Sequence, residues 1–175
     1  MSEVIEVIPI NVKLPQKFMV IGEIQNDDVK VYIKQDIYKL IEKFSSSNIE
    51  IELGGILLGD YVEELGKIHV IISGYIEAEY TDASSSTLTF THETWEHIHN
   101  IYDKQFTDKR MVGWHHTHPS YGIFLSIYDM FIQQNFFDLP WQVAYVVDPI
   151  NKTRGFFQWK NDKIQKLEGF YVYDI

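Results

Sequence analysis

Cysteine is absent from this chain of 175 residues. Disulfide bonds and cysteine-ligated structural zinc are therefore both excluded, and the composition suits a reducing cytosol. No run of 18 apolar residues occurs, so no transmembrane helix and no membrane partner are predicted. The first 16 residues contain two glutamates and no long apolar core, which is unlike a signal peptide. From these absences we expect a soluble, cytoplasmic protein.

Basic residues are also scarce. The chain has 15 Lys and Arg against 25 Asp and Glu, which gives a formal net charge of −10. No cluster of Lys or Arg offsets this balance, so a nucleic-acid partner is not expected. An acidic surface could suit a partner with a basic face, but solubility is the simpler explanation of the charge.

What is present fits one globular domain. Hydrophobic residues make up 45% and charged residues 23%, enough for a sizeable core and unlike a disordered chain. Apolar periodicity predicts strands over residues 29–34, 49–62, 67–78, 111–116, 143–147, 155–159 and 170–173. It predicts helices over residues 37–44, about 95–102 and 126–137. This order indicates an α/β or α+β fold with one mixed β-sheet flanked by helices.

The first 28 residues have a different pattern from the rest. Two short apolar stretches are interrupted there by Pro9 and Pro15. Proline within an apolar stretch is typical of edge strands or of a segment packed on a domain. We therefore divide the chain into an N-terminal extension or arm, residues 1–28, and a main domain, residues 29–175.

A group of polar residues lies where the predicted strand 111–116 ends. His116 and His118 are two apart in an extended segment, so both rings project from the same side, whereas His115 points the other way. After seven intervening residues comes Ser126, and Asp129 follows three positions later. Catalytic zinc usually has three protein ligands and an open fourth position. The spacing predicts a catalytic zinc site with His116, His118 and Asp129 as ligands.

Ser126 and Asp129 have a second explanation. Ser-x-x-Asp before an apolar helical run is a variant of the capping box, and an acidic residue in the first helical turn is favourable in any case. The two explanations are compatible, because a capped helix also fixes where the carboxylate points. Pro119 and Gly122 are expected to turn the loop so that the helix begins beside the histidines.

Hydrolysis of an amide also needs a carboxylate near the metal but not bound to it, to take up a proton and deliver it to the leaving nitrogen. Glu52 is the upstream candidate. It precedes Gly54 and Gly55, which let backbone or ligand approach closely. A glutamate at the start of a strand is more often simply solvated, so this residue type alone does not decide its role.

Three short motifs surround these polar residues. They are Glu52-x-x-Gly55-x-Leu57-x-Gly59, Gly113-Trp114-x-His116-x-His118-Pro119 and Leu125-Ser126-x-x-Asp129. Together they resemble the motifs of the JAMM/MPN-type zinc metalloproteases. The resemblance extends from about Val29 to Tyr173 and includes the Val147-Asp148-Pro149 segment.

The resemblance implies a JAMM/MPN fold, which is cytidine-deaminase-like, and a catalytic member of the family. His116, His118 and Asp129 would bind one catalytic Zn²⁺, and Glu52 would be the general base and then the general acid. Ser126 would stabilise the oxyanion of the tetrahedral intermediate. Glu50 lies two residues from Glu52, but the spacing to Gly55 favours Glu52. Zinc deaminases themselves need a Cys-x-x-Cys pair, which the chain lacks.

The family resemblance also implies a substrate. Such enzymes commonly cleave peptide or isopeptide bonds after the C-terminal Gly-Gly of ubiquitin or a ubiquitin-like protein. Residues 78–90 are a candidate edge or flap that could hold such a tail by strand addition, although a mobile surface loop explains them equally well. Within that segment, Leu88 or Phe90 could contact the substrate.

Two departures limit this analogy. Only three residues connect Phe137 to Trp141, too few for the zinc-binding insertion of some eukaryotic members. With no helical extension after the domain, docking in a large proteasome-like assembly is not expected, and the chain is typical of a minimal, prokaryotic form. Two alternatives stay open: a zinc hydrolase of a small molecule or short peptide, and a non-catalytic MPN scaffold module.

Overall fold

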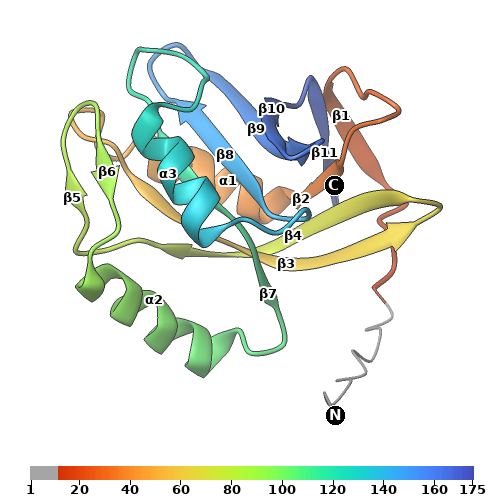
Figure 1. Cartoon of the computed structure of the whole chain (residues 1–175), viewed down its shortest axis with the longest axis horizontal. Helices are drawn as coiled ribbons and strands as arrows, with labels where there is room; N and C mark the ends of the chain where they lie inside the picture. The colour runs from red at the N-terminus through yellow and green to blue at the C-terminus, as the bar shows by residue number, and fades with distance from the viewer. Residues whose placement is uncertain (1–11) are drawn as a thin grey trace.

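A computed structural model describes residues 12–175 of the chain (Figure 1). Within these residues the helices are α1 (Gln35–Ser45), α2 (His92–Gln105) and α3 (Ile127–Phe136). The first strands are β1 (Phe18–Gly22), β2 (Lys30–Lys34), β3 (Gly54–Glu64), β4 (Lys67–Glu77), β5 (Asp82–Ala83) and β6 (Leu88–Thr89). The later strands are β7 (Arg110–Thr117), β8 (Val143–Asp148), β9 (Thr153–Lys160), β10 (Lys163–Lys166) and β11 (Gly169–Tyr173).

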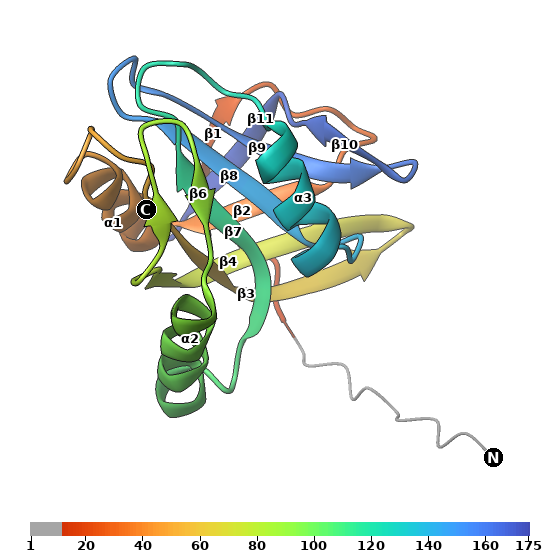
Figure 2. The same ribbon diagram turned by 60° about the vertical axis from the view of Figure 1, so that its left-hand side comes forward.

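Nine of these strands form one mixed sheet in the order β1-β11-β2-β4-β3-β7-β8-β9-β10. The pairs β11·β2, β2·β4 and β7·β8 are parallel, and the other neighbours are antiparallel. Helix α1 packs on one face of the sheet, and α2 and α3 pack on the other (Figures 1 and 2). The predicted fold class, a mixed sheet flanked by helices, is confirmed.

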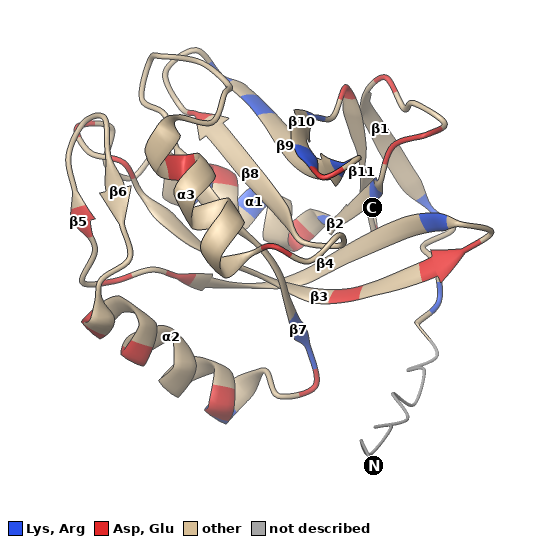
Figure 3. Cartoon of the chain, in the orientation of Figure 1, with Lys and Arg blue, Asp and Glu red and all other residues tan. Residues whose placement is uncertain are grey.

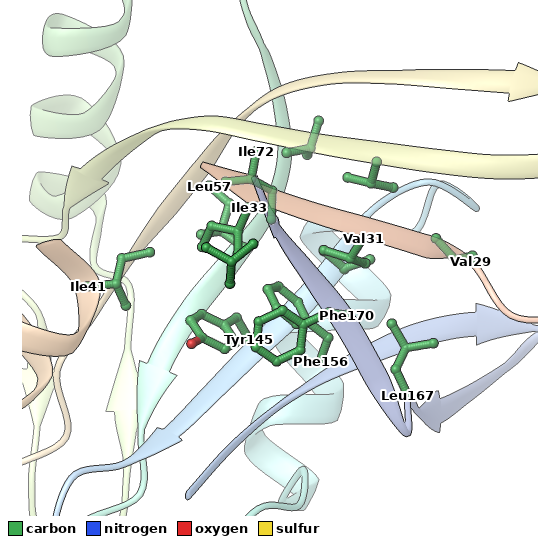
Figure 4. Close-up of a cluster of buried hydrophobic side chains, with 14 of the residues drawn as sticks. Val29, Val31, Ile33, Ile41, Leu57, Ile72, Tyr145, Phe156, Leu167 and Phe170 are labelled. Carbon is green, nitrogen blue, oxygen red and sulfur yellow. The ribbon is translucent and has the colours of Figure 1, made fainter. Parts of the chain in front are cut away.

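The sheet separates two apolar clusters. The cluster on the α1 side combines β-branched residues of the central strands with aromatic residues of the later strands (Figure 4). Tyr145 and Phe156 stack there with ring centroids 4.2 Å apart, and Phe170 packs edge-on against Phe156 at 4.9 Å. The cluster on the other side joins Trp114 of the sheet to Ile98 of α2 and Ile132 of α3. Helix α3 is thus held against the sheet close to the predicted ligands.

The observed elements follow the predicted ones with three differences. The strand predicted from Ile49 begins only at Gly54. Before it, the chain bends, and the amide of Glu52 donates to the carbonyl of Ser84 instead of joining the sheet. The polar segment 84–91 contains the second strand of a small hairpin, β5–β6. Strand β10 was not predicted, because its four residues are KIQK and lie largely exposed at a sheet edge.

The N-terminal segment is partly described. Residues 1–11 of the predicted arm lie outside the described residues. Phe18–Gly22 forms β1, which pairs antiparallel with β11 and adds an edge strand to the main sheet. This agrees with the edge-strand alternative for that stretch, whereas the division between residues 28 and 29 stays a prediction. Within residues 12–175, no helix combines the length and apolar character needed to cross a bilayer.

Gly54 and Gly55 let neighbouring residues pack closely against the start of β3, beside the site. A Cβ on Gly55 would lie 2.3 Å from the hydroxyl of Tyr75, and one on Gly54 would lie 2.6 Å from the side chain of Leu88. Close approach was predicted at both positions. The groups that approach belong to the domain itself: these side chains and the backbone carbonyls of Ile76 and His115.

Candidate metal centre

The structure brings the three predicted ligands together. His116 lies near the end of β7, His118 follows that strand, and Asp129 lies in the first turn of α3. The Nε2 atoms of the two histidines are 3.1 Å apart, and each lies 3.1 Å from Oδ2 of Asp129. All three side chains are buried. Two imidazoles and one carboxylate therefore converge on a single point inside the protein.

The strand alternation explains this arrangement. His116 faces α3 and stacks on Trp114, with ring centroids 4.3 Å apart. His115 faces the opposite side of the sheet, as predicted, where its ring nitrogens pair with the hydroxyls of Ser45 at 3.0 Å and Tyr75 at 2.8 Å. Burial lowers the pKa of His115 well below its ordinary value, so it is a neutral part of the core.

The loop after β7 orients His118. Its Nδ1 pairs with the carbonyl of Gly122 at 3.0 Å. A carbonyl only accepts, so Nδ1 carries a proton, and Nε2 is the ring nitrogen that faces His116 and Asp129. Ligating histidines commonly have such a partner on the other ring nitrogen, because it fixes the tautomer and the ring orientation.

Ser126 and Asp129 form the predicted capping box. The amide of Asp129 donates to Oγ of Ser126 at 3.2 Å, and the amide of Ser126 donates to Oδ2 of Asp129 at 2.8 Å. Burial alone would raise the pKa of Asp129, but the neighbouring imidazoles and the Ser126 amide hold it well below its usual range. The same oxygen therefore caps α3 and faces both histidines.

Glu52 reaches the site through the pairing of β3 with β7, which sets Gly54 opposite His116. Beside that pair, Leu53 and Thr117 exchange two hydrogen bonds of 2.8 Å. The Glu52 carboxylate is 1% exposed, and its Oε1 lies 3.6 Å from Nε2 of His118. Burial raises its pKa, against the effect of a hydrogen bond from Tyr121. Glu50, in contrast, is exposed.

These residues fit a metal ion of the zinc type. Two donors bound at about 2.0 Å in tetrahedral geometry lie about 3.3 Å apart, close to the 3.1 Å sides of the observed triangle. The described residues also leave Oε2 of Glu52 buried without a partner. A buried carboxylate oxygen beside a set of three donors is the expected neighbour of a cation and its open position.

Two residues around the site were not assigned a role from the sequence. Tyr121 donates its hydroxyl proton toward Glu52, with the two oxygens 2.5 Å apart. Asp148, quoted only as part of a motif, is buried and accepts hydrogen bonds from the amides of Ser120 and Gly122. Neither role leaves a local pattern, because the partners are far apart in the chain. Leu88 and Phe90 were expected as possible substrate contacts. Both are largely buried in the apolar cluster on the α2 and α3 side of the sheet.

Fold and site together define a mixed-sheet domain with a buried His-His-Asp cluster that could hold a metal ion. Residues 26–139 match the family described as JAB1/Mov34/MPN/PAD-1 ubiquitin protease. The chain belongs to this JAMM/MPN family, which confirms the resemblance seen in its motifs.

Among curated proteins, the chain is 33% identical over 122 residues to an uncharacterized protein of Caenorhabditis elegans, covering 65% of this chain and 35% of the relative. It is 30% identical over 136 residues to the 26S proteasome regulatory subunit RPN11 of Eremothecium gossypii, covering 76% and 43%. It is 28% identical over 132 residues to ubiquitin carboxyl-terminal hydrolase RPN11 of Saccharomyces cerevisiae, covering 74% and 42%. The chain thus spans less than half the length of these relatives.

A solved structure has the same fold. The solution structure of protein DSY2949 from Desulfitobacterium hafniense matches with a TM-score of 0.58 and 16% sequence identity, and the match covers 79% of this chain and 90% of that one. At this identity the likeness concerns the fold alone.

Proposed function

We propose that the chain is a zinc-dependent peptidase or isopeptidase that cleaves after the C-terminal Gly-Gly of a ubiquitin-like protein, in a conjugate or a precursor. The observation that carries the proposal is the buried donor triangle of His116, His118 and Asp129 with the Glu52 carboxylate beside it. Membership of a family described as a ubiquitin protease supports the substrate class. We assign the catalytic domain to residues 29–175.

The proposed chemistry divides among the residues of the site. His116, His118 and Asp129 would hold Zn²⁺, which when bound lowers the pKa of water to roughly 7 and polarises carbonyl groups. Glu52 would take the proton from the attacking water and pass it to the leaving nitrogen. Its raised pKa suits this exchange, because a more basic carboxylate holds a proton more readily. The Ser126 hydroxyl would donate to the developing oxyanion.

A groove beside the site supports an extended substrate. Its volume is about 410 Å³, and its walls come from β6, the residue after it and α3: Leu88, Thr89, Phe90, Ile127, Tyr128, Phe131, Ile132 and Phe136. Strand β6 pairs only with β5 among the described strands, so it has an edge to which a tail could add. Neither β6 nor α3 carries a Lys or Arg (Figure 3).

The exposed apolar side chains along this groove favour a polypeptide tail over a small molecule. Ile127, Tyr128 and Phe131 are 85%, 65% and 60% exposed along one side of it. Large exposed apolar patches on monomers commonly mark binding surfaces. Leu88 and Phe90 contribute the floor, since most of their surface is buried in the core. We assign the contact with the tail to the backbone of β6 and the exposed side chains of α3.

The decisive experiment compares Glu52→Ala with the matched variant Glu50→Ala on fusions of a ubiquitin-like protein that carry an internal Gly-Gly bond. Glu52→Ala should lose about 10²- to 10⁴-fold in kcat and keep its zinc. Glu50→Ala should behave as wild type, because this neighbouring carboxylate is exposed.

Metal analysis separates the alternatives. Wild type should contain one zinc per chain, and His116→Ala should lose it. Zinc-loaded wild type that cleaves no Gly-Gly fusion would contradict the substrate and favour a small-molecule hydrolase. A chain that takes up no zinc would instead favour a non-catalytic scaffold module.

A further inference from the structure

Tyr121 contacts three parts of the site at once. Its hydroxyl lies 2.5 Å from Oε1 of Glu52 and 2.9 Å from the carbonyl of Ser85 in the β5–β6 hairpin, and these two acceptors share its one proton in a three-centre hydrogen bond. Its ring stacks on His118, with centroids 4.7 Å apart and an angle of 24° between the planes. One side chain therefore joins the proposed base, a proposed ligand and the hairpin beside the groove.

The loop that carries Tyr121 is fixed in place. The residues on either side, Ser120 and Gly122, have positive φ angles of 74° and 85°, so the chain makes a tight turn around the tyrosine. Both amides donate to the buried carboxylate of Asp148 at 3.0 Å. A side chain presented from such a turn has little freedom to follow movements of its partners.

The hairpin is tied to the same glutamate by a second bond. The amide of Glu52 donates to the carbonyl of Ser84 at 2.8 Å. The turn itself is closed by Ser84, whose amide donates to the Thr87 carbonyl at 2.9 Å and whose hydroxyl pairs with Oγ1 of Thr87 at 2.7 Å. Glu52 is thus attached to the hairpin at its backbone and, through Tyr121, at its carboxylate.

We propose that Tyr121 is a positioning residue that holds the Glu52 carboxylate beside the donor triangle and couples its orientation to the β5–β6 hairpin. This inference rests on the proposed function for its catalytic consequence. Glu52 has no other hydrogen-bond donor on its side chain among the described residues, since its Oε2 has no partner. Without the tyrosine hydroxyl, the orientation of the Glu52 carboxylate would depend, within the described structure, only on its contact with the proposed site.

Tyr121→Phe tests the proposal, because it removes the hydroxyl and keeps the ring on His118. Relative to wild type, kcat on the Gly-Gly fusion should fall on the order of 10- to 100-fold, as for a misplaced catalytic group. KM should change less than kcat, because the side chains that line the groove are all retained. Zinc content should be unchanged, because the ligands are intact. Adding Tyr121→Phe to Glu52→Ala should cost nothing further, since the tyrosine acts through the glutamate.

A readout independent of activity is hydrogen exchange of the backbone amides. In Tyr121→Phe, the amides of residues 80–90 should exchange several-fold faster. The hairpin loses its hydrogen bond from Tyr121 and keeps the one from the Glu52 amide. Tyr61→Phe is the matched control. Tyr61 stacks on Trp141 far along β3, with centroids 4.5 Å apart, and its substitution should leave both kcat and hairpin exchange as in wild type.

The outcomes divide cleanly. The coupling is overturned if Tyr121→Phe has the kcat and the hydrogen exchange of wild type. It is also overturned if this variant loses zinc, because the hydroxyl would then take part in metal binding. Should wild type cleave no fusion, the proposed function fails, and the exchange of residues 80–90 still decides whether Tyr121 ties the hairpin to Glu52.

Discussion

Single atoms in this domain serve two purposes, and Ser126 is the clearest case. Its Oγ accepts the amide of Asp129 and caps α3, while its proton stays available for the proposed oxyanion. Ser126→Ala should therefore lower the free energy of unfolding by about 1 kcal/mol, the usual cost of losing an N-cap. Urea denaturation in the presence of a chelator measures this loss without any contribution from metal.

The control for this prediction is Ser126→Thr, which keeps a hydroxyl and should retain most of the stability. If the unfolding midpoint of Ser126→Ala equals that of wild type, the cap contributes nothing, and any loss of activity in this variant belongs to chemistry alone.

At the residue scale, the clustering of the predicted ligands could be anticipated from the sequence, and the residues around them could not. His116, His118, Ser126 and Asp129 lie within one short segment, where spacing along the chain carries over into space. Glu52 was a candidate because Gly54 and Gly55 follow it, but only the family resemblance gave it a role, since an isolated glutamate has no local signature. Its partner Tyr121 is 69 positions away, and no periodicity connects two side chains over such a distance.

At the scale of elements, the loop between β7 and α3 depends on one carboxylate. Asp148 accepts the amides of Ser120, Gly122, Ile150 and Asn151 and the side-chain amide of Asn151. Burial alone would raise the pKa of Asp148, but these hydrogen bonds hold it below its ordinary value of 3.8. A lowered pKa means that the folded state favours the charged carboxylate.

The sign of the pH dependence follows. Asp148 contributes stability above its unfolded pKa, and that contribution is lost as the pH falls through the lower folded pKa. Asp148→Asn should melt at a lower temperature than wild type at pH 7, because an amide group would face the Gly122 amide. The difference between the two melting temperatures should shrink below about pH 4. If the difference in melting temperature between wild type and Asp148→Asn stays constant down to pH 3, the charge of the Asp148 carboxylate does not stabilise the fold.

The elements themselves were largely predictable. Apolar periodicity marks α1, α2, α3 and the long strands, because these bury one face or both in a cluster. The β5–β6 hairpin was not predicted, since two-residue strands are too short for any alternation and a run of three serines resembles a loop. Such strands are defined by their hydrogen-bond partners, which the local sequence does not contain.

For the whole molecule, a bound metal should couple to folding. The donor atoms come from β7, the following loop and α3, and they converge only in the folded chain. A ligand that binds only the native state stabilises it by about 2.7 kcal/mol at a hundredfold excess over its Kd. Removing zinc from wild type with a chelator should therefore lower the melting temperature by several degrees, measured by differential scanning calorimetry.

His116→Ala is the matched control for metal removal. It lacks one vertex of the donor triangle, so its melting temperature should respond little to either chelator or added zinc. An equal response in wild type and His116→Ala would place the metal elsewhere on the molecule.

The stacking of Trp114 on His116 has a practical consequence. The two rings are nearly parallel, at 9°, and both side chains are fully buried. Indole fluorescence is sensitive to the electronic state of an adjacent imidazole, and the rings of Trp114 and His116 are in direct contact. Trp114, one of four tryptophans in the chain, should therefore report on His116, and its fluorescence should change when a metal ion binds at the site.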